Sequence, residues 1–179
     1  MNKKVLILSS SPRKCGNSDL LCNEFLKGAR ETGNQTEKIF LKDKQINHCT
    51  GCSICSIHGK PCPQKDDAGE IVEKMINADV IVMATPVYFY TMCGQMKTMI
   101  DRCCARYTEI SHKEFYFILT AAENNQTLME RTIEGFRGFL DCLENPIEKG
   151  TIYGIGAWKI GEIKNTPAMQ KAYLMGKNV

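Results

Sequence analysis

The stretch "KKVLILSSSPRKCGNS", residues 3–18, decides the fold of this chain because it joins a buried strand to the start of a helix. The run from Val5 to Leu8 is short, continuous and apolar, which is typical of a strand buried on both faces of a sheet. Apolar residues follow helical spacing from Asn17 to Gly33, and Asn17 or Ser18 is the expected N-cap. These residues predict one strand–loop–helix unit of a parallel sheet.

The same alternation continues to the end of the chain. Further strands are expected at 36–42, 78–88, 114–122 and 151–158, and further helices from 66, at 94–104, at 127–143 and from 166. Strict alternation of about five strands and five helices predicts an α/β doubly wound parallel sheet with helices on both faces.

Length and composition narrow the class of protein. The 179 residues fit a single domain, 1–179, with 43% hydrophobic and 24% charged residues. A net charge of +3 is too small to indicate a nucleic-acid partner, and the N-terminal apolar run is too short for a leader or a membrane span. We therefore expect a cytoplasmic protein, in which the ten cysteines are reduced and serve metal or redox chemistry more often than disulfides.

Ligands of such sheets bind at the carboxyl ends of the strands, so three loops are candidates for one site. The loop 9–18 offers hydroxyls, Arg13 and a helix N-terminus, which suit an anion such as phosphate. It has neither the Walker nor the G-x-G-x-x-G pattern, and a polar turn with an N-cap is the alternative. The loop 85–94 places aromatic residues where they can stack on a planar ring or pack elsewhere, and the loop 120–125 offers small residues.

These motifs together resemble the flavodoxin-like NAD(P)H-dependent FMN reductases. "SSSPRKCGNS" resembles the phosphate loop of that family, "TPVYFYTMCGQMKTMIDR" resembles its second loop and following helix, and "GEIKNTPAMQKAYLMGKNV" resembles its C-terminal helix. The segment "CTGCSICSIHGKPCPQKDD" resembles the cysteine segment of the iron–sulfur flavoprotein branch. The resemblance implies a flavodoxin-like five-stranded sheet of order 2-1-3-4-5, bound FMN, and a homodimer or homotetramer.

The resemblance also implies roles for individual residues. The phosphate of FMN would lie on the first loop, and the ring and ribityl chain on the other two. The implied residues are Ser9, Ser11, Arg13, Asn17, Ser18, Pro86, Val87, Tyr88, Phe89, Thr120, Ala121 and Ala122. Cys15 and Cys93 depart from the family's commonest residues, and Cys93 is interpreted as a small packing residue rather than a reactive thiol.

Four cysteines in the loop insertion at about 47–66 have the spacing C-x2-C-x2-C-x6-C. This spacing differs from paired zinc knuckles and is typical of bacterial ferredoxin segments, which favours a [4Fe–4S] cluster on Cys49, Cys52, Cys55 and Cys62. Reductases of the wider family carry a similar segment without a cluster, so a thiol-rich loop over the flavin or at a subunit contact is the alternative.

The expected function is that of an FMN-dependent oxidoreductase. Electrons would come from NAD(P)H, or from ferredoxin if the cluster exists, and would pass to a small acceptor such as a quinone or free flavin. No catalytic side chain is expected, since the chain has no Ser/His/Asp or H-E-x-x-H pattern. A non-enzymatic electron carrier between partner proteins is the alternative, and the sequence does not separate NADH from NADPH.

Overall fold

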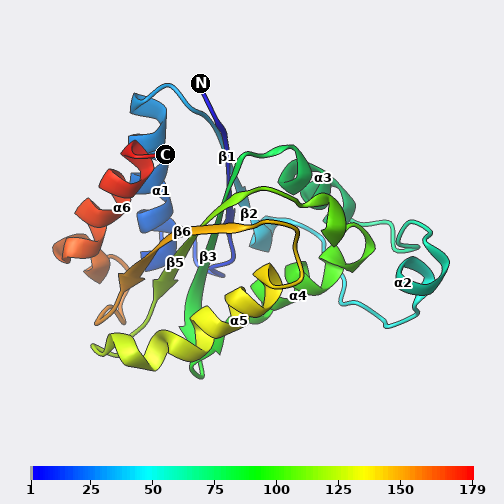
Figure 1. Cartoon of the computed structure of the whole chain (residues 1–179). Coiled ribbons are helices and arrows are strands. Elements are labelled where there is room, and N and C mark those ends of the chain that lie inside the picture. The colour runs from blue at the N-terminus through cyan, green and yellow to red at the C-terminus, as the bar shows by residue number, and fades with distance from the viewer. Residues whose placement is uncertain (1) are drawn as a thin grey trace.

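The computed structural model describes residues 2–179 and contains a central parallel sheet (Figure 1). The strands β1 (Lys4–Ser9), β2 (Gln35–Phe40), β3 (Val80–Tyr88), β5 (Glu114–Thr120) and β6 (Ile147–Gly154) lie in the order β2-β1-β3-β5-β6. All four pairings along this path are parallel, so the predicted doubly wound arrangement is confirmed. The carboxyl ends of β1, β3 and β5 consequently lie at one edge of the sheet.

The prediction of five strands was wrong by one, because a short strand β4 (Thr91–Met92) pairs antiparallel with the end of β3. Phe89 and Tyr90 form the two-residue turn, with φ angles of 49° and 62°. Such hairpin turns need positive φ at both positions, which Asn-Gly sequences normally supply. Because two aromatic residues occupy the turn instead, the sequence carries no hairpin signal.

Helices cover both faces of the sheet, as predicted (Figure 1). Both faces must be covered because successive side chains of a strand point to opposite faces. In β1, Val5 and Ile7 enter one core, and Leu6 and Leu8 enter the other. The first core lies under α1 (Asn17–Glu31) and α6 (Pro167–Lys177), and the second under α3 (Ala68–Asn77), α4 (Gly94–Arg102) and α5 (Glu130–Leu140). The short helix α2 (Ile54–His58) lies on a segment that projects from the body.

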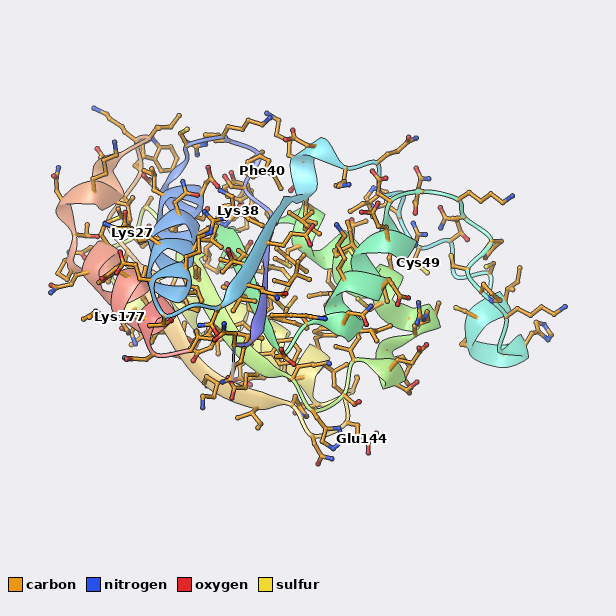
Figure 2. All side chains as sticks on the ribbon, turned by 90° about the horizontal axis from the view of Figure 1, so that it is seen from above. Lys27, Lys38, Phe40, Cys49, Glu144 and Lys177 are labelled. Atoms are coloured by element: carbon orange, nitrogen blue, oxygen red, sulfur yellow. The ribbon has the colours of Figure 1, made fainter. Side chains whose placement is uncertain are left out.

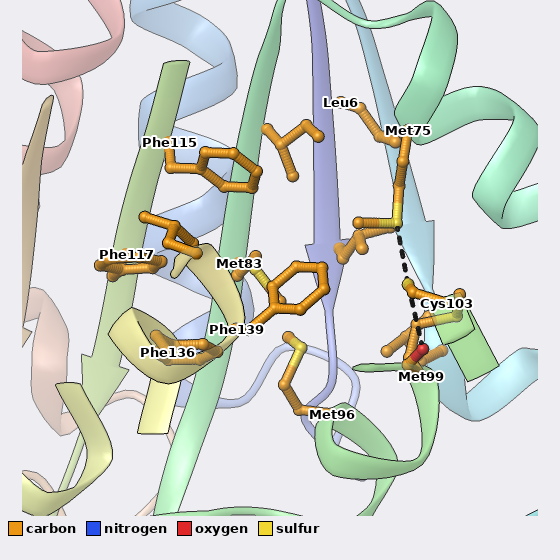
Figure 3. Close-up of a cluster of buried hydrophobic side chains, with 14 of the residues drawn as sticks. Leu6, Met75, Met83, Met96, Met99, Cys103, Phe115, Phe117, Phe136 and Phe139 are labelled. Carbon is orange, nitrogen blue, oxygen red and sulfur yellow. Dashed lines mark hydrogen bonds between the residues drawn. The ribbon is translucent and has the colours of Figure 1, made fainter. Parts of the chain in front are cut away.

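Figure 3 shows the core on the α3–α4–α5 side of the sheet. Phe117 of β5 stacks on Phe136 of α5, with ring centroids 4.7 Å apart. Met96 and Met99 of α4 are fully buried here, together with Cys103. These two methionines therefore fill the core beneath α4 and are not part of an exposed surface.

Two predicted boundaries differ from the structure in ways that matter for the site. The last strand was expected at 151–158, but β6 ends at Gly154 and residues 155–161 form a loop. The N-cap of α1 is Gly16 rather than Asn17 or Ser18, so both of those side chains lie in the first turn of the helix. Among residues 2–179, no helix combines the length and apolar character needed to cross a bilayer.

Candidate functional site

A cleft at the carboxyl edge of the sheet brings the three candidate loops together. It holds about 470 Å³ of empty space, part of it open to solvent. Its walls are Ser11, Arg13, Gly16, Asn17, Ser18, Pro86, Val87, Tyr88, Thr120, Ala121, Ala122, Ala157 and Trp158. The implied site residues therefore meet at one place, apart from Ser9 and Phe89.

Ser9 and Phe89 lie outside this cleft for opposite reasons. Ser9 is the last residue of β1 and is fully buried in the sheet. Phe89 is 97% exposed at the tip of the β3–β4 hairpin. It borders a neighbouring hollow, which shares Val87, Ala121 and Ala122 with the cleft. The hairpin turn thus moves Phe89 off the cleft wall while Tyr88 stays on it.

The first loop contains polar groups of the kind that can bind an anion. The Ser18 hydroxyl is buried in the first turn of α1 and has no hydrogen-bond partner among residues 2–179. Within residues 2–179, the Arg13 guanidinium forms no ion pair and no hydrogen bond. Gly16 has no room for a side chain, since a Cβ there would lie 2.9 Å from the Arg13 carbonyl oxygen. A free cation, an unpaired hydroxyl and a helix N-terminus therefore line the same end of the cleft.

The nearby carboxylate of Asp19 is neutralised, so it does not oppose an anion. Asp19 is buried, accepts a hydrogen bond from the Cys15 amide at 3.0 Å, and pairs with the Lys38 ammonium at 2.5 Å. Cys15 itself has a φ of 56°, a conformation that directs the loop around the N-terminus of α1. Lys14 pairs with Asp43 at 2.8 Å, so Arg13 is the cation of this loop that has no ion pair among residues 2–179.

A buried thiol connects the first two loops. Cys93 precedes α4 and is 1% exposed, and its Sγ donates to the Ser10 carbonyl oxygen at 3.3 Å. The Ser10 hydroxyl in turn donates to the Ala84 carbonyl oxygen of β3 at 2.7 Å. Cys93 therefore packs the loop 9–18 against β3. This agrees with its interpretation from the sequence as a small packing residue.

Asn17 has a different contact from the one that the resemblance implied. Its Nδ2 donates to the carbonyl oxygens of Ala157 and Lys159, both at 3.0 Å, and its Oδ1 accepts from the Gly161 amide at 2.9 Å. The side chain is fully engaged in holding the loop after β6 against the start of α1. Asn17 is thus a positioning residue for that loop.

Trp158 is a wall of the cleft that sequence reasoning missed. The residue is 73% exposed, and its backbone amide donates to the Glu162 carboxylate at 2.8 Å. The sequence pattern predicts a strand that includes "GAW", but Gly156 at a φ of 69° turns the chain away just after β6 ends. That glycine was the available signal that the strand ends before Trp158.

None of the four cysteines of the insertion lines this cleft. Figure 2 shows the chain at Cys49 leaving the body on the side away from Lys27 and Lys177. Cys49 and Cys52 are exposed, and Cys55 and Cys62 are half-buried. Within residues 2–179, no three His, Cys, Asp or Glu side chains are placed to hold a metal ion. Four thiols are suitable ligands for an iron–sulfur cluster, but the segment as folded does not bring them to one point.

The cysteines instead contact the end of α4 and the 3-10 turn that follows it, Cys103–Ala105. The Arg102 Nη2 donates to the Cys62 Sγ at 3.5 Å, and the Sγ atoms of Cys55 and Cys104 are 4.0 Å apart. Hydrogen bonding to the Ile54 amide lowers the pKa of Cys52, which favours the thiolate. Burial, and then the neighbouring Cys55, raise the pKa of Cys104. The spacing of Cys104 in the sequence gives no sign of this contact.

Fold and cleft together define an α/β protein with a flavodoxin-like sheet and a cleft at the N-terminus of its first helix. The chain belongs to the family described as NADPH-dependent FMN reductase, whose profile matches residues 3–141. An iron–sulfur flavoprotein of Archaeoglobus fulgidus is 31% identical over 98% of this chain and 93% of its own length. An iron–sulfur flavoprotein of Methanocaldococcus jannaschii is 46% identical over 55% of this chain and 51% of its own length.

The matched region thus spans only about half the length of several relatives. Among solved structures, an NAD(P)H:quinone oxidoreductase of Methanothermobacter marburgensis superposes with a TM-score of 0.79 at 17% identity. That comparison covers 99% of this chain and 97% of the other, and it supports the fold.

Proposed function

We propose that the chain is an FMN-dependent oxidoreductase that takes electrons from NAD(P)H and delivers them to a small acceptor such as a quinone or free flavin. The observation that carries this proposal is that the Ser18 hydroxyl and the Arg13 guanidinium, neither with a partner among residues 2–179, line one cleft that also reaches Tyr88. A phosphate would satisfy the hydroxyl and the guanidinium, and the missing side chain at Gly16 lets the loop fold tightly against the start of α1.

In this proposal each wall of the cleft has a separate task. Ser11, Arg13 and Ser18 bind the phosphate, and Asn17 holds the loop of Trp158 in place. Pro86, Val87 and Tyr88 form one wall for the ring and ribityl chain, and the backbone of 120–122 forms another. FMN, when bound, supplies hydride acceptance and one- or two-electron transfer. The protein's own contribution is orientation and the exclusion of water from the buried part of the cleft.

The first test removes the two proposed phosphate contacts. We expect Arg13→Ala with Ser18→Ala to weaken FMN binding by at least about tenfold, since one hydrogen bond to a charged group contributes about 1.5–3 kcal/mol. Titration of FMN fluorescence measures the effect, and Arg131→Ala on the exposed side of α5 is the control. An unchanged Kd in the double variant would contradict the phosphate assignment.

Oxidation of NAD(P)H separates the enzyme from a pure electron carrier. The FMN-loaded protein is expected to oxidise NADH or NADPH faster than free FMN does when a quinone is present. A rate equal to that of free FMN would exclude the reductase proposal. Reduction by ferredoxin would then identify the carrier alternative. Comparing the two nucleotides also reveals the preferred donor.

We further propose that Cys49, Cys52, Cys55 and Cys62 hold a [4Fe–4S] cluster, which would exchange single electrons with the flavin. Support comes from their free thiols, their spacing and the two relatives named as iron–sulfur flavoproteins. Because the four thiols do not converge in this structure, loading requires the segment to rearrange.

The cluster proposal predicts iron and sulfide in protein purified without oxygen. Alanine at any one of the four positions should remove the cluster and leave FMN bound, because the cleft does not include the segment. Cys142→Ala, at an exposed thiol on the body, should change neither. Negligible iron in anaerobic wild-type protein, beside a normal flavin spectrum, would leave a plain FMN reductase with a thiol-rich loop.

A further inference from the structure

Two thiols from distant parts of the chain face each other beside the cysteine segment. The Sγ of Cys55 on α2 is 4.0 Å from the Sγ of Cys104, which lies in the turn after α4, 49 positions further along the chain. Cys104 is exposed and Cys55 is half-buried, so a small reagent can reach both. By contrast, Cys22, Cys93 and Cys103 are buried.

The segment is built so that these sulfurs can come closer. A disulfide needs its sulfurs about 2.0 Å apart, so the pair must approach by about 2 Å. Helix α2 is short and lies between Gly51 and Gly59, at φ angles of 63° and 60°. No other atom lies within 4 Å of the position that a side chain would take at either glycine. The chain at Cys104 is anchored by the adjacent Cys103, which is packed in the core, whereas α2 contains no buried residue. Movement of α2 alone can thus close the gap.

We propose that Cys55 and Cys104 form an oxidisable thiol pair, which hydrogen peroxide converts to a reversible disulfide. One thiol reduces the O–O bond, gains an oxygen as a sulfenic acid and releases one water. The second thiol attacks that sulfur, forms the S–S bond and releases the second water. Two thiols and one peroxide thus give one disulfide and two waters, and a small dithiol reverses the change.

The consequence concerns the cysteine segment. The disulfide ties α2 to the end of α4 and withdraws Cys55 from the four-cysteine set. If the proposed cluster exists, cluster and disulfide therefore exclude each other, and the bond is a state of the cluster-free protein. The thiol pair itself rests only on the contact between the two sulfurs and on their accessibility.

Peptide mapping tests the pair directly. The full chain is reduced, freed of iron with a chelator, desalted, treated with an equimolar amount of hydrogen peroxide, alkylated and digested with trypsin without reductant. Trypsin leaves all four cysteines of the segment in the peptide 45–65, because Lys60 precedes Pro61, and it leaves Cys104 in the peptide 103–106. We expect the two peptides to be joined, and dithiothreitol to separate them.

Single variants assign the bond. The joined mass should disappear in Cys55→Ser and in Cys104→Ser, and persist in Cys49→Ser and Cys52→Ser. Disulfides confined to 45–65 in the wild type, or a joined mass that survives Cys104→Ser through Cys103, would overturn the proposal. FMN content, measured on the same samples, should stay unchanged in every variant. Loss of flavin binding in a variant would count against the proposed function. The peptide mapping alone shows whether Cys55 and Cys104 form the disulfide.

Discussion

Replacing Arg102 with alanine is expected to lower the free energy of unfolding by about 3–5 kcal/mol, because it leaves a buried carboxylate without its partner. Arg102 Nη1 and Nη2 lie 2.5 and 3.0 Å from the Asp66 carboxylate oxygens, and the two side chains are 3% and 1% exposed. Both side chains have little contact with solvent, so water compensates only poorly for the lost partner. The effect should therefore be far larger than for an ion pair on the surface.

This ion pair also holds the two ends of the cysteine segment together. Asp66 accepts from the Asn47 amide at 2.9 Å, and Arg102 donates to the Asn47 carbonyl oxygen at 2.8 Å. Arg102 contacts Cys62 as well, so both ends of the insertion are held at one point on α4. We expect Arg102→Ala to expose the segment, with faster alkylation of Cys62 than in the wild type.

Urea unfolding measures the stability change, and Arg137→Ala is the matched control. Arg137 pairs with Glu134 and Glu148, but its side chain is 45% exposed, and such pairs contribute about 0–1 kcal/mol. Losses of similar size in the two variants would show that burial adds nothing to the Asp66–Arg102 pair.

The pH dependence of the pair has a definite sign. Burial alone would raise the pKa of Asp66, but hydrogen bonds from Arg102 and from the Asn47 and Ala68 amides bring it below the ordinary 3.8. A carboxyl with a lowered pKa stabilises the folded state above its unfolded pKa, and this contribution disappears as the pH falls through the folded pKa. The wild type should therefore lose stability below about pH 4.

Gly176→Ala is expected to destabilise the chain by about 3 kcal/mol, at the upper end of the usual cost of overpacking. A Cβ at Gly176 of α6 would lie 2.0 Å from the Phe25 carbonyl oxygen of α1, and one at Gly28 would lie 2.1 Å from the Tyr173 carbonyl oxygen. The two helices thus touch backbone to backbone, and no side-chain rotation relieves the clash. Because α1 carries the proposed phosphate site at its start, FMN binding should weaken as well.

Gly138→Ala provides the same chemical change at a helical position without a neighbour. No atom lies within 4 Å of a Cβ built at Gly138 on α5, and the residue is exposed. This variant should be unchanged or more stable by about 0.5–1 kcal/mol, owing to the higher helix propensity of alanine. Thermal unfolding of both variants gives the comparison. Equal Tm values for the two would rule out the close contact between α1 and α6.

Local sequence patterns were sufficient for the parallel strands and their helices. An apolar run such as Val5–Leu8 supplies side chains to both faces, so a doubly covered strand follows from the residues themselves. Because the carboxyl ends of parallel strands share one edge, the loops after them could be placed together as well. The cleft contains all of the residues implied by the resemblance except Ser9 and Phe89. Their roles in binding FMN stay a prediction until the variants are measured.

Contacts between segments that are remote in sequence were decided only by the tertiary structure. Asn17 carries the residue type of a phosphate ligand, yet it binds a loop 140–144 positions away. Trp158 reaches the cleft because β6 ends early, and Cys104 meets Cys55 because α4 ends beside the insertion. Periodicity reports which face of an element is buried, since that depends on neighbours along the chain. It contains no information on which side chains meet across loops, because that depends on how the packed helices and strands place the loop ends.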